Sequence, residues 1–408
     1  MNILLEIKLP STPVYKIPVK FSPRSAAESF TVSPQFCNFF ALMRFSGILT
    51  IPSPLFKIEI RDRGKAVMEQ KQTARGRFAP SPSGRMHLGN LFCALVAWLS
   101  ARNQNAQMLL RVEDLDPSRC RREYERQLEE DLRWLGLDWD EGGLFPAEGC
   151  SSRDVQREAA WPDDGGSPAG GLSSYCQSER GAVYQHFFRI LQERGLIYPC
   201  FCSRDELHAA GAPHQSDGTP RYNRRCLSLS TSERERLAAL RPPAWRLRVP
   251  DEVFSFEDGC RGSRAANLEK SCGDFIIRRS DGVFAYQLAV VVDDALMGVT
   301  EVVRGGDLLD STPRQLYLYR LLGFSAPRFF HLPLLLAPDG RRLSKRDRDL
   351  DCGILRSRFS PEELLGRLGF LAGLLPVPAP VTLRDLLSEF CWDKIPRADI
   401  LVPEELFQ

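Results

Sequence analysis

The order of short apolar runs and helical runs between residues 76 and 135 is the feature that most limits how this chain folds. Short strands are predicted at 77–79 and 108–112, and each is followed by apolar residues at helical spacing, over 88–103 and 124–135. A turn rich in Pro and Gly separates the first strand from its helix. Strand–helix–strand–helix order with tight turns is typical of a parallel sheet covered by helices, so the sequence predicts an α/β fold.

The rest of the chain divides at turns and at changes of composition. Gly, Ser and Pro are frequent over 142–177, which predicts a flexible insertion. The wholly apolar run 288–292 ends at two Asp residues and predicts a buried strand, and a turn at 280–282 predicts a hairpin over 275–285. Helices are also predicted at 183–191, 308–322, 361–375 and 383–390, and a strand at 329–336. We therefore expect a main α/β domain made of 74–195 and 246–325, an inserted segment at 196–245, and a loop with helices at 326–408.

Residues 1–73 differ from the rest of the chain. They hold ten Lys or Arg against five Asp or Glu, whereas the whole chain has 54 against 52 and a formal charge of +2. Pro and Ser interrupt this stretch, and no periodicity extends beyond a few residues. We interpret it as an atypical, poorly ordered extension. A targeting or RNA-contacting arm, and upstream sequence translated before a start at Met68, are the alternatives.

Composition excludes several classes of protein. The near-neutral charge excludes a protein that holds nucleic acid by bulk positive charge alone, so contacts with a polyanion must be local. No apolar run reaches the roughly 18 residues that span a bilayer, which excludes a membrane-embedded transporter. Twelve Cys in 408 residues are too sparse for a disulfide scaffold, and no apolar secretory segment follows Met1. We expect a reducing, cytoplasmic location.

The first motif, RFAPSPSGRMHLGN at 77–90, leads from a predicted strand through a Pro/Gly turn to the start of a helix. In a parallel sheet this places backbone N–H groups and a helix N-terminus at the carboxyl end of a strand, where anions bind. His87 can donate to phosphate oxygens, and Gly89 allows a ring or a phosphate to approach the backbone. A His-x-Gly pair alone is usually structural, but the preceding Pro-x-Pro-Ser-Gly at fixed spacing makes this motif specific.

The second motif, RRLSKR at 341–346, follows a predicted apolar strand and a Pro-Asp-Gly turn. Such a run is usually a solvated charged surface. A mobile basic loop at this position also fits the stabilisation of negative charge on a transferring phosphoryl group.

Together the two motifs resemble the HIGH and KMSKS signatures of class I aminoacyl-tRNA synthetases, and RFAPSPSG is similar to the glutamyl branch. The resemblance continues through RVEDLD at 111–116, FAYQLAVVVDD at 284–294 and VRGGDL at 303–308. It implies a Rossmann-like nucleotide-binding domain with an inserted zinc-containing subdomain and a short C-terminal helical region. Asn90 stands where the first signature ends in His, and only Ser344 and Lys345 of the second core are kept.

The resemblance also implies which residues act. Catalytic roles are expected for His87, Gly89, Asn90, Ser344 and Lys345, and ATP contacts for His87, Gly89 and Lys345. Glutamate binding is expected from Arg77, Phe78, Ala79, Pro80, Ser81, Glu113, Tyr286 and Arg304. The chemistry agrees, because glutamate presents two carboxylates for guanidinium groups and one ammonium for an acid such as Glu113. The substrate carboxylate is itself the nucleophile on the α-phosphorus of ATP, so catalysis is positioning and charge stabilisation, with Mg²⁺ expected alongside ATP.

Three cysteines have the spacing of metal ligands. Cys200, Cys202 and Cys226 supply three thiols, one fewer than a tetrahedral zinc site needs. The family resemblance proposes Tyr222 as the fourth ligand, whereas plain ligand chemistry favours His208 or His214. We expect one structural zinc ion, and three free thiols without metal are the alternative.

Only 63 residues follow Lys345, fewer than the anticodon-reading region of a full glutamyl-tRNA synthetase requires. The chain thus resembles short paralogues within the glutamyl branch, which implies transfer of ATP-activated glutamate to the queuosine base of tRNA(Asp). A truncated synthetase that charges tRNA(Glu), or a non-catalytic tRNA-binding paralogue, are the alternatives. We expect a monomer that binds ATP, L-glutamate and queuosine-containing tRNA(Asp), and no membrane.

Overall fold

The structure is a computed structural model that describes residues 74–143, 174–203, 206, 222–343 and 350–407, together with five strands among the first 73 residues. Residues 1–72 and 73–408 form two compact units. The first unit contains two antiparallel sheets, β1 (Asn2–Ile7) with β2 (Tyr15–Lys20), and β3 (Leu49–Pro52) with β4 (Phe56–Arg61) and β5 (Lys65–Gln70). The sequence did not predict these strands, and the interpretation of residues 1–73 as an atypical, poorly ordered extension stays a prediction. Each strand has at most six residues, too few for the alternation to stand out from the sequence.

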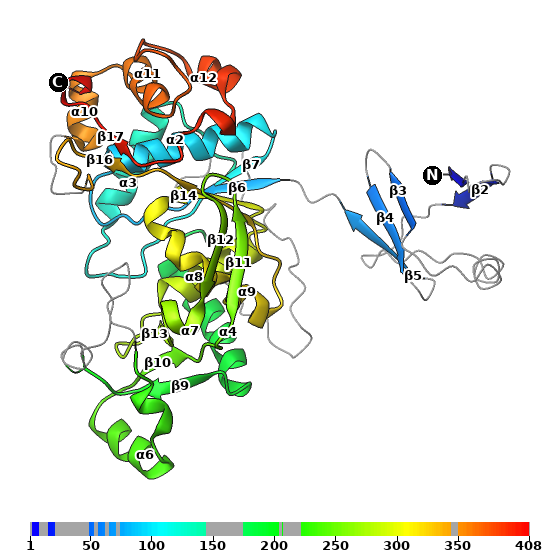
Figure 1. The fold of residues 1–408 in the computed structure, drawn as a ribbon, viewed down its shortest axis with the longest axis vertical. Coiled ribbons are helices and arrows are strands. Elements are labelled where there is room, and N and C mark those ends of the chain that lie inside the picture. The colour runs from blue at the N-terminus through cyan, green and yellow to red at the C-terminus, as the bar shows by residue number, and fades with distance from the viewer. Residues whose placement is uncertain are drawn as a thin grey trace. The chain divides into compact units, whose positions relative to one another are not determined.

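Parallel strands form the centre of the second unit (Figure 1). One group has the order β6 (Arg75–Phe78), β7 (Gln107–Leu110), β8 (Glu141–Gly142). The other has β14 (Glu301–Gly305) and β15 (Arg328–Leu332) in parallel, followed by β11 (Val253–Asp258) and its antiparallel partner β12 (Gly262–Asn267). Thr300, just before β14, donates its backbone N–H to the carbonyl oxygen of Arg75 on β6 at 2.9 Å, so the two groups lie side by side. The predicted parallel α/β fold is confirmed.

Helices cover this sheet. α2 (Leu88–Asn103) has the predicted bounds, and α3 (Arg122–Trp134) overlaps the predicted 124–135. Leu88, Leu91 and Leu95 on α2 are fully buried in a hydrophobic cluster that it shares with the C-terminal helices. Those helices, which lie beside α2 in Figure 1, are α10 (Cys352–Arg358), α11 (Pro361–Leu371) and α12 (Leu383–Glu389).

A second hydrophobic cluster contains three helices, α4 (Gly181–Glu193), α8 (Tyr286–Leu296) and α9 (Thr312–Leu322). The run 288–292, predicted as a strand, is the middle of α8. All five of its residues are buried, so the helix is apolar all round there and shows no amphipathic period. The three consecutive Val residues favoured a strand locally, but burial against α4 and α9 decides the conformation.

A smaller antiparallel sheet carries the cysteine segment, in the order β13 (Phe275–Arg278), β10 (Ala244–Leu247), β9 (Ile197–Cys200). The predicted hairpin over 275–285 is reduced to one bridge, between Arg278 and Phe284. The remaining short elements are α6 (Thr231–Leu240), α7 (Leu268–Ser271), β16 (Leu335–Leu336), β17 (Ile400–Leu401) and the 3₁₀ helices Gln177–Arg180, Arg225–Ser228, Gly306–Ser311, Trp392–Lys394 and Glu404–Leu406. Within the described ranges, every helix is too short or too polar to cross a bilayer.

Candidate active site

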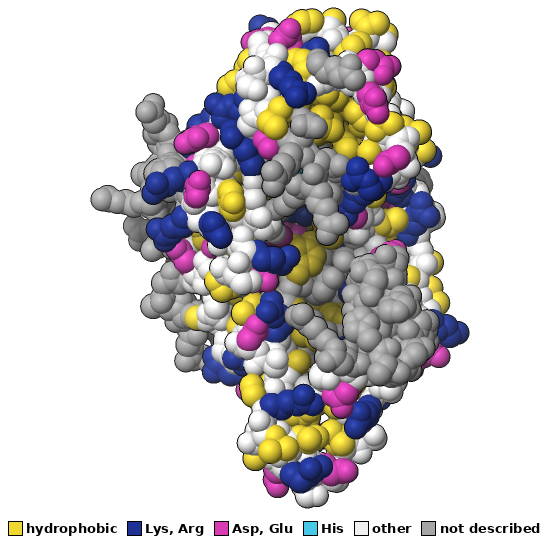
Figure 2. Space-filling model, turned by 90° about the vertical axis from the view of Figure 1, so that its left-hand side faces the viewer, with side chains coloured by type: hydrophobic (Ala, Val, Ile, Leu, Met, Phe, Trp, Pro, Cys, Tyr) yellow, Lys and Arg dark blue, Asp and Glu magenta, His cyan; other side chains and the backbone are white. Residues whose placement is uncertain are grey.

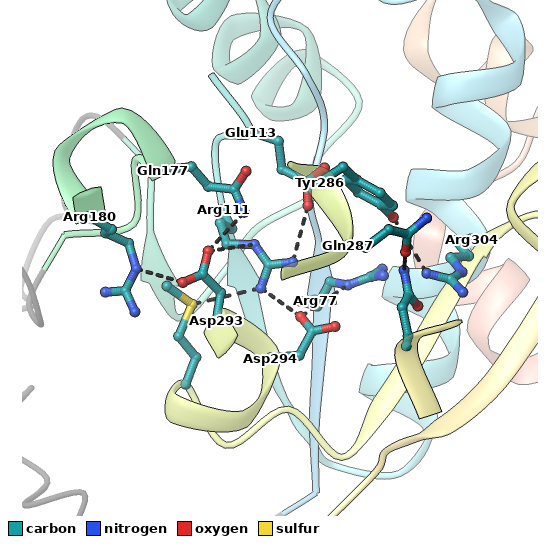
Figure 3. A network of polar contacts seen from close by, with 12 residues as sticks. Arg77, Arg111, Glu113, Gln177, Arg180, Tyr286, Gln287, Asp293, Asp294 and Arg304 are labelled. Atoms are coloured by element: carbon teal, nitrogen blue, oxygen red, sulfur yellow. Dashed lines mark hydrogen bonds and ion pairs between the residues drawn. The ribbon is translucent and has the colours of Figure 1, made fainter. Parts of the chain in front are cut away.

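Three arginines lie where the central strands of the sheet end. Arg77 is on β6, Arg111 follows β7 and Arg304 is on β14, and they are 4%, 0% and 5% exposed. Because parallel strands end at the same edge, the three side chains reach one region (Figure 3). A buried guanidinium without a counter-charge is costly, so the groups that pair with these arginines define the site.

Asp294, on the last turn of α8, joins two of these arginines. Its Oδ1 accepts a hydrogen bond from Arg111 Nη1 at 2.6 Å and lies 3.8 Å from Arg77 Nε. Arg111 Nη2 also donates to Glu113 Oε1 at 3.2 Å. Burial alone would lower the pKa of Arg111, but the surrounding carboxylates raise that pKa well above its ordinary value. Arg111 is therefore a permanent cation among three acids, because Asp293 Oδ2 also lies 4.0 Å from its Nε.

The site also contains a tyrosine and a further acid. Arg304 Nη1 donates to the hydroxyl of Tyr286, the first residue of α8, at 3.4 Å, and Arg77 interacts electrostatically with both. Glu113 interacts electrostatically with Arg77 and Tyr286, and its backbone N–H donates to the carbonyl oxygen of Pro80 at 3.0 Å. Burial raises the pKa of Glu113, and Arg111 and Arg77 act against this rise. The structure thus brings Arg77, Glu113, Tyr286 and Arg304 into one network, as expected from the sequence; their roles stay predictions.

A second acid on α8, Asp293, binds residues that border the site, and the sequence alone had suggested no role for it. Asp293 accepts hydrogen bonds from Arg180 Nε at 2.7 Å, from Gln177 Nε2 at 2.8 Å and from the Tyr184 hydroxyl at 2.8 Å. Asp293 itself is fully buried. Two acids at the end of an apolar run were a visible signal, but their partners lie more than 100 residues away in the sequence.

Arg304 also has partners on the side away from Tyr286, which sequence analysis missed. Its Nε donates to His331 Nε2 at 2.9 Å, and its Nη2 donates to Thr312 Oγ1 at 2.8 Å. His331 in turn contacts Asp258 through Nδ1 at 2.5 Å. Burial lowers the pKa of His331 to about 4.

The first motif forms the N-terminus of α2. His87 is the N-cap, and its Nδ1 accepts a hydrogen bond from the backbone N–H of Gly89 at 3.1 Å. A side chain at position 89 would have its Cβ 3.0 Å from the His87 ring, so a larger residue there would force this ring to shift by a few tenths of an ångström. Asn90, which departs from the signature, completes a capping box by accepting from the His87 backbone N–H at 3.1 Å. In the turn before the helix, Phe78 and Pro80 are buried, Ala79 is half-buried and Ser81 is exposed.

The start of the second motif is held against the end of β14. Arg342 Nη2 donates to Asp307 Oδ2 at 2.8 Å, and Leu343 pairs with β16 through its backbone. Beyond the motif, Asp351 pairs with His87 as an isolated bridge, so segments flanking the second motif lie near the first. Ser344 and Lys345 lie outside the described residues.

The three expected cysteines lie together. The sulfur atoms of Cys200, Cys202 and Cys226 are all within 4.8 Å of one another, and Cys202 Sγ is 3.6 Å from Cys226 Sγ. The Tyr222 hydroxyl is 3.7 Å from Cys202 Sγ and accepts from the Cys226 backbone N–H at 2.8 Å. His208 and His214 lie outside the described residues, so the choice of fourth ligand stays open.

Comparison with known proteins places this geometry in context. Residues 73–364 match the family described as tRNA synthetases class I (E and Q), catalytic domain. Over 335 residues, 81% of the chain, it is 48% identical to a glutamyl-Q tRNA(Asp) synthetase of Symbiobacterium thermophilum and 46% identical to one of Nitratidesulfovibrio vulgaris, and it covers 96% of each. It is 38% identical to a glutamate–tRNA ligase 2 of Syntrophus aciditrophicus, of which it covers 64%.

The fold is also similar to solved structures. A glutamate tRNA ligase from Elizabethkingia meningosepticum, crystallised in complex with its amino acid, superimposes with a TM-score of 0.65 at 27% sequence identity. This match covers 82% of the present chain and 68% of that protein.

Proposed function

Because this chain belongs to the class I tRNA synthetase family for glutamate and glutamine, we propose that it activates glutamate with ATP and transfers it to the queuosine base of tRNA(Asp). The observation that supports the activation step is that the strand-end site brings the guanidinium groups of Arg77 and Arg304 together with the carboxylate of Glu113. The transfer step is supported by the two relatives named for it, whose length this chain covers almost completely.

The charged groups of the site match those of glutamate. Arg77 and Arg304 are suited to the two carboxylates, and Glu113 is suited to the ammonium group. Arg111, which donates to Glu113 at 3.2 Å, favours the charged form of that carboxyl group. Tyr286 adds a hydroxyl beside Arg304. The α-carboxylate then attacks the α-phosphorus of ATP, and pyrophosphate leaves, so the protein supplies orientation and charge rather than a covalent intermediate.

The first motif is suited to the phosphates of ATP. Since His87 Nδ1 accepts from the Gly89 backbone, the neutral ring carries its proton on Nε2, the donor that a phosphate oxygen needs. The N-terminus of α2 adds its positive dipole end. We assign ATP contacts to Lys345 as well, on the resemblance of its motif. Mg²⁺ bound with ATP would neutralise part of the phosphate charge.

We also propose that Cys200, Cys202 and Cys226 hold a structural zinc ion, with Tyr222 as fourth ligand. A tetrahedral site with Zn–S bonds of about 2.3 Å places its sulfur atoms about 3.8 Å apart, close to the observed 3.6 Å between Cys202 and Cys226. The ion would hold the end of β9 to the 3₁₀ turn at Arg225–Ser228. Equimolar zinc in the purified protein, lost in Cys226→Ser, tests the site, and Tyr222→Phe tests the fourth ligand against His208 or His214.

The tRNA would contact local basic patches. Figure 2 shows Lys and Arg side chains spread along the length of one face, with Asp and Glu among them, rather than one region of a single sign. α6, which carries the exposed Arg236, is part of the inserted segment 196–245, and we propose that this segment contacts RNA. Such contacts position a nucleic acid without specifying its sequence.

Two assays test the proposed function. Glutamate-dependent exchange of pyrophosphate into ATP tests activation, with aspartate and glutamine as controls and Lys345→Ala as the variant expected to lose exchange. Transfer is tested with labelled glutamate and tRNA(Asp) whose 3′ end is blocked by removal of the terminal adenosine, because periodate would also cleave the vicinal diol of queuosine. Attachment that survives the block and requires queuosine supports the proposal. Attachment to tRNA(Glu) that the block abolishes indicates a truncated charging enzyme, and no exchange at saturating substrate indicates a tRNA-binding protein without catalysis.

A further inference from the structure

Arg304 is held from behind by a row of side chains that crosses three neighbouring strands. Arg304 on β14 and His331 on β15 are register partners in the parallel pair, and Asp258 is the last residue of the next strand, β11. Nε of Arg304 contacts His331 Nε2 at 2.9 Å, and His331 Nδ1 contacts Asp258 Oδ2 at 2.5 Å. All three residues are at most 5% exposed.

The direction of these hydrogen bonds follows from the chemistry of arginine. A guanidinium only donates, so His331 Nε2 must be the acceptor and cannot carry a proton. The ring proton is therefore on Nδ1, where it is donated to the Asp258 carboxylate. Asp258 is itself fixed, because its Oδ1 accepts from the backbone N–H groups of Cys260 at 3.0 Å and Arg261 at 2.8 Å. The row has only one arrangement of donors and acceptors.

With these partners in place, only one side of the Arg304 guanidinium is left to contact a ligand in the site. Nε is used by His331 and Nη2 by Thr312, and the group lies over the ring of Phe329 at 5.2 Å from the centroid. Nη1 faces the Tyr286 hydroxyl, at the end of the site where Arg77 also lies (Figure 3). A carboxylate in the site can therefore meet Arg304 only through its Nη1 side.

We propose that His331, oriented by Asp258, is a positioning residue that aims Arg304 at a carboxylate of the substrate. The proposal deepens the proposed function and rests on it for the identity of that substrate. His331 does not touch the substrate, so its contribution is to binding of glutamate and not to binding of ATP.

The test compares two replacements of His331 in the full chain. The amide of Asn reaches the position of Nδ1 and can still donate to Asp258, but it offers Arg304 no acceptor. The amide of Gln reaches the position of Nε2 and offers Arg304 its carbonyl oxygen. We expect His331→Asn to raise the KM for glutamate about tenfold to a hundredfold in pyrophosphate exchange, with the KM for ATP within twofold, and His331→Gln to recover a large part of this loss.

A matched control separates positioning from general loss of structure. Glu301 starts β14 and pairs with Arg328 on β15 at 2.8 Å, at the opposite end of the same strand pair. Glu301→Gln should lower the thermal midpoint without changing the KM for glutamate. If His331→Asn does not fold, Asp258→Asn, which removes the charge behind the ring, should raise the KM for glutamate severalfold.

The outcomes distinguish this proposal from the proposed function. Unchanged glutamate KM in His331→Asn, equal losses in the Asn and Gln variants, or a parallel rise in the KM for ATP would each overturn the positioning role while wild-type exchange stands. If the wild type shows no exchange, the proposed function fails. In that case calorimetry of glutamate binding tests the positioning role. Weaker binding to His331→Asn than to the wild type supports this role, whereas equal binding to the two proteins, or no binding to the wild type, refutes it.

Discussion

The buried His331 predicts a specific pH dependence of stability. Its pKa is about 4 in the folded protein, mainly because burial disfavours the charged ring, against an ordinary value of 6.5. Between these values the unfolded chain binds a proton that the native protein does not, so stability must fall as the pH is lowered from 6.5 towards 4. Above pH 6.5 neither state binds this proton, and the full contribution to stability is present.

The shift sets the magnitude. The difference of about 2.5 units between the two pKa values corresponds to about 3 kcal/mol in the free energy of unfolding. Of this, about 2.5 kcal/mol is lost when the pH is lowered to 4.5. The groups that face His331 are Asp258 from β11, Arg304 from β14, Thr312 at the start of α9 and Arg77 from β6. Burial tends to raise the pKa of Asp258, but His331 and backbone donors lower it below its ordinary value of 3.8. The contribution of Asp258 to the free energy of unfolding is therefore lost only below about pH 3.8, outside the range from pH 4.5 to 6.5.

Urea unfolding measured at several pH values between 4.5 and 7.5 tests the prediction. All six Trp lie after residue 73, so their fluorescence reports on the second unit alone. Over this range the wild type should lose about 2.5 kcal/mol more than His331→Asn, whose amide still donates to Asp258 but does not titrate. Equal pH dependence in the two proteins would refute the argument.

Three further predictions concern other charged groups and the thiols. Glu113→Gln removes the charge meant for the substrate ammonium, so kcat/KM for glutamate in pyrophosphate exchange should fall about tenfold to a hundredfold while the KM for ATP is kept; an equal fall for both substrates would contradict this role. Asp294→Asn removes the charge that faces buried Arg111, and urea unfolding should show a loss of about 3–5 kcal/mol, whereas a loss below 1 kcal/mol would show that the pair is dispensable. A strong chelator should lower the thermal midpoint of the wild type but not that of Cys226→Ser, and no change in either protein would argue against a structural metal.

The sequence was sufficient where local pattern and tertiary environment agree. The bounds of α2 followed from apolar residues at helical spacing after a Pro/Gly turn, and the strand ends on either side located Arg77 and Glu113. It was insufficient for α8, because a run of buried apolar residues has the same appearance in a helix and in a strand.

Partners distant in sequence were the other limit. Asp293 and Arg180 are 113 positions apart, and His331 and Asp258 are 73 apart, so no local spacing connects them. Asn90 shows a third limit. Its place in the first signature predicted a catalytic role, which stays a prediction, but the sequence did not indicate that its amide caps the helix.

The length of α8 is under a constraint of its own. Tyr286 and Asp293 are seven residues apart, which is two turns of the helix, and Asp294 is the next residue. One helix therefore carries the hydroxyl that contacts Arg304 and also the acids that bind Arg111 and Arg180. Inserting or deleting one residue between them would turn the later side chains by about 100° around the helix axis. Both acids would then face away from their arginines, so changes of length should be tolerated only beyond Leu296.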